Sequence, residues 1–118
     1  MKYLVAAAVA LLSCASPASA DGLSVTGLVV DPVLAAGKPY DVAFKYKGDA
    51  GSIWEVCFLW SGEGPYCWTN FSVDAGKKLI RTRAKTNNPG KYTFTGFVRY
   101  GDGGSQATKK LSKPIEVR

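Results

Sequence analysis

The chain has 118 residues, with 15 Lys and Arg against nine Asp and Glu, a formal net charge of +6 and no histidine. Without histidine, Ser–His and Cys–His nucleophile pairs and most zinc sites are excluded. The length suits one domain with a single hydrophobic core.

The first 20 residues have the pattern of an export signal. Lys2 supplies a positive start, residues 3–12 form an apolar run, and Ala18-Ser19-Ala20 is a small-x-small sequence of the kind that signal peptidase cuts. We therefore expect residues 1–20 to be a signal peptide and residues 21–118 to be the exported domain, periplasmic or extracellular. In that oxidising environment a pair of cysteines is expected to form a disulfide.

Lipidation is the alternative to this cleavage. Leu11-Leu12-Ser13-Cys14 partly resembles a bacterial lipobox, although Leu12 fits poorly where that motif favours a small or β-branched residue. Beyond residue 20 no apolar run reaches the length of about 20 residues that a membrane-spanning helix needs. We therefore expect no transmembrane anchor in the exported domain.

The exported part reads as strands almost throughout. Tyr40 to Lys47 alternates apolar and polar residues, as a half-buried strand does, and segments rich in Gly, Pro, Asn and Asp separate it from similar runs. The expected strands are seven: residues 23–30, 40–47, 53–60, 66–73, 78–86, 91–100 and 107–117. Seven short strands at this spacing predict an all-β fold, a two-sheet antiparallel sandwich of immunoglobulin-like design.

Short motifs add a family resemblance. The run Asn88-Pro89-Gly90-Lys91-Tyr92 resembles the turn before the penultimate strand of immunoglobulin-like domains, and Tyr92 matches the corner tyrosine whose hydroxyl bonds back to the backbone. The opening residues 23–40 look like the first two strands of bacterial immunoglobulin-like and cell-adhesion-related modules. By the same resemblance, Trp54 matches the tryptophan that such domains bury at their centre.

The cysteines depart from the antibody pattern. The second cysteine of an antibody domain lies two residues after the corner tyrosine, and Phe94 stands there in this chain. If the strands fold back about Gly62, Cys57 instead faces Cys67 across one hairpin, at a Cα separation of about 5 Å that a disulfide accepts. We expect this bond to be structural, because the spacing is not that of a redox motif.

The same hairpin holds the strongest candidate binding residues. It contains all three tryptophans of the chain and is apolar on both sides, whereas one face of a sandwich sheet normally meets water. One interpretation is that Trp60, Tyr66 and Trp68 form a rigid platform that stacks on sugar rings or anchors a protein. The other is that these three side chains cap the end of the sandwich.

A basic row gives a second candidate surface. Residues 65–118 carry 11 Lys and Arg against three Asp and Glu, a balance of +8. Within them Arg81, Arg83 and Lys85 alternate along one strand and should project outward together, towards an anionic glycan or simply towards water. Nucleic acid is not expected as a partner, because Arg99 and Lys109 should lie in the opposite sheet and the chain is predicted to be exported.

The sequence thus predicts an exported, non-enzymatic binding module without cofactor or metal. We expect it to recognise a protein or glycan of the cell envelope through Trp60, Tyr66 and Trp68, with Arg81 and Arg83 as auxiliary contacts. The alternative is a structural subunit that pairs through an apolar patch or an edge strand. A hydrolase that uses two carboxylates is a third, weaker hypothesis. The sequence leaves the oligomeric state open.

Overall fold

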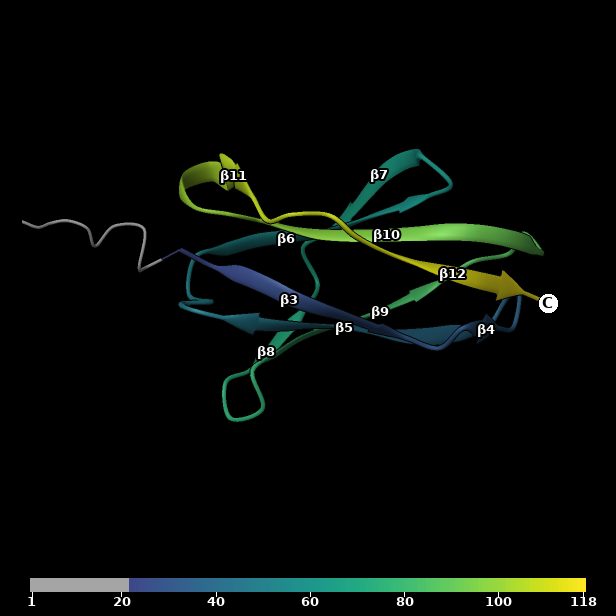
Figure 1. Ribbon diagram of the computed structural model, residues 1–118, viewed down its shortest axis with the longest axis horizontal. Helices are drawn as coiled ribbons and strands as arrows, with labels where there is room; N and C mark the ends of the chain where they lie inside the picture. The colour runs from purple at the N-terminus through teal and green to yellow at the C-terminus, as the bar shows by residue number, and fades with distance from the viewer. Residues whose placement is uncertain (1–21) are drawn as a thin grey trace, which may run out of the picture.

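The computed structural model describes residues 22–118 (Figure 1). The predicted signal peptide, its cleavage site and Cys14 lie outside the described residues. Residues 22–118 contain no helix that is long and apolar enough to cross a bilayer.

Two β-sheets form the two layers seen in Figure 1. The four-stranded sheet has the spatial order β3 (Ser24–Val30), β5 (Pro39–Lys47), β9 (Leu79–Lys85) and β8 (Ser72–Asp74). The six-stranded sheet has the order β4 (Val33–Leu34), β12 (Leu111–Val117), β10 (Gly90–Tyr100), β6 (Ile53–Trp60) and β7 (Glu63–Trp68), with β11 (Gln106–Ala107) also paired to β10. A 3₁₀ turn, η1 (Asp102–Gly104), precedes β11.

This arrangement confirms the immunoglobulin-like sandwich. Strands β3, β5, β9 and β8 make one sheet. In the other sheet β6, β10 and β12 lie side by side, as the third, penultimate and last strands of immunoglobulin domains do. All neighbouring strands are antiparallel except β4 and β12, which are parallel at Glu116↔Val33 and Val117↔Leu34. This parallel pair is an addition to the predicted antiparallel pattern.

Two of the predicted strands are divided in the structure. The expected strand 66–73 becomes β7 in one sheet and β8 in the other, and Figure 1 shows the chain passing between the layers there. The Thr82 hydroxyl donates a hydrogen bond of 2.8 Å to the backbone oxygen of Asn70, which anchors the crossing. The expected strand 107–117 is interrupted at Thr108, whose Oγ1 accepts a 2.9 Å hydrogen bond from the Val98 amide.

The core lies between the sheets and is built from the inward positions of the alternating strands. In β5 the inward residues are Tyr40, Val42, Phe44 and Tyr46, all buried. The ring of Phe58 stacks on Phe44 with centroids 6.0 Å apart. Phe58 also stacks on Phe94 at 5.1 Å, and these three fully buried rings form the centre of the sandwich.

The corner tyrosine is confirmed. The hydroxyl of Tyr92 donates to the backbone oxygen of Asn88 at 2.9 Å and lies 3.3 Å from that of Pro89. Phe94, at the position of an antibody cysteine, has no exposed surface. Phe94 therefore supplies apolar packing where an antibody domain has its inter-sheet disulfide.

The expectation that Trp54 is buried at the centre is wrong, because this side chain is 46% exposed. The pairing of β6 with β10 shifts register between Arg99 and Tyr100, and this β-bulge turns the end of β6 outward. The Trp54 ring lies under the Arg99 guanidinium at 5.7 Å and packs against Gly104, whose φ of 72° suits glycine. Val56 and Phe58 take the buried positions instead.

Candidate functional site

The hairpin disulfide is present at the predicted pair. Cys57 and Cys67 are bonded, with their Cα atoms 4.1 Å apart, and the strand register is Val56↔Trp68, Cys57↔Cys67 and Phe58↔Tyr66. Cys57 is fully buried, whereas every residue of β7 except the half-buried Trp68 is exposed. The edge strand β7 is therefore held by β6, by the disulfide and by Trp68, whose ring lies 5.2 Å from Phe58.

The turn of this hairpin is set by two residues with positive φ. Ser61 has φ of 49° and Gly62 has φ of 88°, the sign that the favoured two-residue hairpin turn requires at both positions. The register then shifts, so that Trp60 faces Glu63 rather than Gly64. This bulge directs β7 away from the sandwich, as Figure 1 shows.

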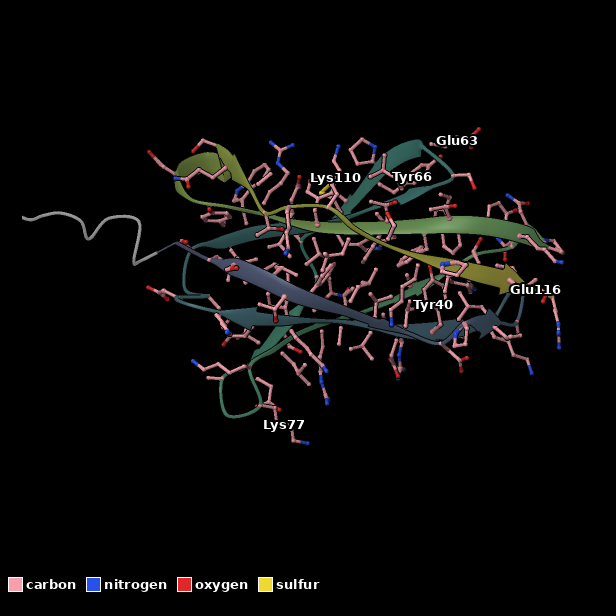
Figure 2. All side chains as sticks on the ribbon, viewed as in Figure 1. Tyr40, Glu63, Tyr66, Lys77, Lys110 and Glu116 are labelled. Carbon is pink, nitrogen blue, oxygen red and sulfur yellow. A yellow bond between two sulfur atoms is a disulfide. The ribbon has the colours of Figure 1, made fainter. Side chains whose placement is uncertain are left out.

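A groove of about 750 Å³ lies between β7 and residues 85–88. The groove brings together all three predicted aromatic residues, which lie beside two further tyrosines and several polar side chains. Its lining comprises Tyr40, Trp60, Glu63, Pro65, Tyr66, Cys67, Trp68, Lys85, Thr86, Asn87, Asn88 and Tyr92. In Figure 2, Glu63 and Tyr66 lie on the projecting β7 arm and Tyr40 lies between the two sheets.

The three aromatic residues differ in how they are held. Trp60 is half-buried, with its ring centroid 4.7 Å from Phe94 and 5.2 Å from Tyr92. Trp68 packs against the core in the same way, whereas Tyr66 is 52% exposed. The two tryptophans therefore serve both the core and the groove wall, and Tyr66 offers the most accessible ring.

Arg81 and Arg83 do not line this groove. They lie with Lys85 on the outward positions of β9, as predicted, and Arg83 is paired with Asp41 through a 3.0 Å contact between Nε and Oδ1. Both partners of that pair are exposed, so it contributes about 0.5 kcal/mol. Lys85 is the member of the basic row that reaches the groove.

Sequence reasoning did not assign Tyr40, Asn87 or Asn88 to the site. Tyr40 reads as a core residue in an alternating strand, and Asn87 and Asn88 read as turn formers before Pro89. Their meeting with β7 depends on the packing of one sheet on the other. The local pattern carries no signal for that contact.

Among the residues of the groove, Tyr40 is the one whose pKa is shifted from its ordinary value. The residue is only 9% exposed, and burial raises the pKa of its hydroxyl from 10.0 to about 12. Its ring meets that of Trp60 edge-on, with centroids 6.3 Å apart. The hydroxyl therefore stays protonated, as a hydrogen-bond donor, far above neutral pH.

This raised pKa predicts a loss of stability in alkali. Below pH 10 both the folded and unfolded states keep the proton, but between pH 10 and about 12 the unfolded state releases it first. We expect the free energy of unfolding to fall by roughly 2 kcal/mol more in the wild type than in Tyr40→Phe across that range. Urea unfolding of both proteins at pH 9, 10 and 11.5 measures the difference, and parallel pH curves would contradict it.

One cluster in the described part of the chain has the spacing of a metal site. The ligand atoms of Glu55, Cys57 and Cys67 lie within 4.8 Å of one another. The two sulfurs are bonded to each other, so neither is a thiolate ligand, and Glu55 pairs with Arg99 at 3.4 Å. In this oxidised form the three residues make a disulfide and an ion pair that link neighbouring strands.

Comparisons with known proteins find similarity in shape and none in sequence. No protein-family model matches the chain, and no curated protein sequence matches it. Among solved structures it is similar to the PKD domain of an M14-like peptidase from a Thermoplasmatales archaeon, with 11% identity and a TM-score of 0.49. That likeness covers 80% of this chain and 94% of the PKD chain. The immunoglobulin-like assignment rests on the sheet order and the Tyr92 corner.

Proposed function

We propose that this chain is an exported, non-enzymatic module that binds a glycan of the cell envelope in the groove between β7 and residues 85–88. The observation that carries the proposal is the meeting of Trp60, Tyr66 and Trp68 in one groove. Export is supported by the leader pattern of residues 1–20 and by the Cys57–Cys67 bond, because disulfides persist in oxidising compartments.

The chemistry of the groove favours a sugar over a flat protein surface. Aromatic rings provide apolar faces, and amide and hydroxyl groups beside them provide hydrogen bonds, the combination that orients a small ligand in a cleft. Here Tyr66 and Trp68 line the same groove as Asn87 and Asn88. The volume of about 750 Å³ lies within the ordinary range for ligand sites of 300–1,000 Å³.

The same lining argues for binding without turnover. Glu63 is the one carboxylate among the described residues that line the groove. Glycoside hydrolysis by the usual route needs two carboxyl groups on either side of the scissile bond. The groove therefore supports recognition more readily than the hydrolase hypothesis.

Assembly through the edge of β7 is less well supported. Strand addition uses the free N–H and C=O groups of an edge strand, and Pro65 removes one of those donors from β7. Proline on an edge strand is a common device against such pairing. A structural subunit remains the rival that the binding experiment separates.

The test is a glycan array of neutral and acidic oligosaccharides, followed by calorimetry on Tyr66→Ala. We expect this variant to bind at least tenfold more weakly, because it removes the most exposed ring of the groove, while its circular dichroism stays native. Trp54→Ala is the control, since Trp54 is also exposed but does not line the groove, and it should bind as the wild type does. Equal affinity of Tyr66→Ala and wild type would contradict the proposal, and a stable homo-oligomer that binds no glycan would support the rival.

A further inference from the structure

Three tyrosines line the groove, Tyr40, Tyr66 and Tyr92, and the fold uses the hydroxyl of one of them. The Tyr92 hydroxyl donates to the backbone oxygen of Asn88 and completes the corner before β10. Among residues 22–118, the hydrogen bonds include none to the Tyr40 hydroxyl, although that side chain is only 9% exposed. Buried hydroxyls in native proteins normally have a partner. The buried Tyr46 hydroxyl also has no hydrogen bond within residues 22–118, but Tyr46 does not line the groove, so the missing partner and the place in the groove together single out Tyr40.

The position of Tyr40 is fixed by its strand. Alternation along β5 turns Tyr40 inward, and its ring meets Trp60 edge-on at the base of the groove. Burial keeps the hydroxyl protonated up to about pH 12, so it can donate a hydrogen bond throughout the physiological range. A rigid, nearly buried donor in a binding groove discriminates strongly, because a ligand without an acceptor there leaves it unpaired.

The charges around this donor are balanced. Among residues 22–118, Lys85 and Glu63 are the two charged residues that line the groove, and their formal charges cancel. The other cations of the basic row, Arg81 and Arg83, lie outside the groove, and Arg83 already has Asp41 as its partner. The groove therefore offers no excess positive charge to an acidic sugar.

We infer that Tyr40 is the specificity-determining donor of this groove, and that the ligand is a neutral saccharide that places an acceptor oxygen on the Tyr40 hydroxyl. The inference rests on the proposed function and adds the ligand class and the residue that selects it. Sugar hydroxyl, ring and glycosidic oxygens are suitable acceptors, and the rings of Tyr66 and Trp68 provide the stacking surface beside them.

The test uses Tyr40→Phe, which removes one oxygen and keeps the ring. The probes are neutral hexasaccharides of glucose, mannose and N-acetylglucosamine and an acidic hexauronate, titrated by calorimetry. We expect Tyr40→Phe to bind the best neutral hexasaccharide roughly tenfold more weakly than the wild type. Its thermal midpoint near pH 7 should be equal or higher, because the unpaired hydroxyl contributes nothing to the free protein. A purely structural role would lower the midpoint instead.

Tyr46→Phe is the matched control. It makes the same atomic change at the other end of β5, about 20 Å away at the usual rise per strand residue, and should leave affinity unchanged. Wild-type affinity in Tyr40→Phe, together with loss of binding in Tyr66→Ala, would overturn the inference and leave the proposed function standing. Tighter binding of the hexauronate would overturn the neutral ligand class. If no hexasaccharide binds, both proposals fail.

Discussion

Removal of the Cys57–Cys67 bond is expected to lower the free energy of unfolding by about 3 kcal/mol. The two cysteines are ten residues apart, and the loss of loop-closure entropy for such a loop has this size in the chain-entropy model. The effect is large for a domain of this length, since small domains have total stabilities of about 5–15 kcal/mol. Because β7 has one paired neighbour and is otherwise exposed, the groove should lose affinity along with stability.

Urea unfolding with and without reductant measures this contribution. The Cys57→Ala, Cys67→Ala double variant is the control, and its midpoint should match that of the reduced wild type and should not respond to reductant. Equal midpoints for oxidised and reduced wild type would show that the bond does not stabilise the fold.

Phe58→Ala is expected to cost about 4 kcal/mol, in the range for a fully buried phenylalanine. Phe58 has no exposed surface, and its ring contacts those of Phe44, Phe94 and Trp68. The substitution leaves a cavity between the sheets and removes the surface on which Trp68 is packed. Binding in the groove should therefore weaken in the fraction of protein that remains folded.

Equilibrium unfolding of Phe58→Ala and the wild type, followed by both tryptophan fluorescence and circular dichroism, measures this loss of free energy of unfolding. Val29→Ala is the control, because Val29 is 45% exposed and its truncation should cost less than about 1 kcal/mol. A loss below about 1 kcal/mol for Phe58→Ala would place the centre of the core elsewhere.

The features that could be predicted from the sequence depend on the alternation of apolar and polar residues along a strand and on the residues that form turns. The alternation in β5 placed Tyr40, Val42, Phe44 and Tyr46 on one face, and all four are buried. Folding back about Gly62 predicts Cys57 opposite Cys67, and the structure has this pair. The turn residues Ser61 and Gly62 alone would place Cys57 opposite Tyr66, so the pair depends also on the bulge that follows the turn.

The errors arose where the period breaks. At the register shift opposite Arg99 and Tyr100, Trp54 is the extra residue of β6 and lies on the outside, and a single sequence does not show where a strand bulges. The crossing near Asn70 split one expected strand between two sheets, because its anchor is the distant Thr82. Tyr40 entered the site only through the contact between the two sheets.

The most direct test of groove binding follows the three indole N–H signals in ¹⁵N-labelled protein during titration with the best neutral hexasaccharide. Trp60 and Trp68 line the groove, whereas Trp54 lies on the outer face beside Gly104 and serves as an internal reference. We predict that the signals of Trp60 and Trp68 shift in a saturable manner while that of Trp54 stays in place. A shift of Trp54 alone, or no shift at saturating ligand, would contradict recognition through this groove.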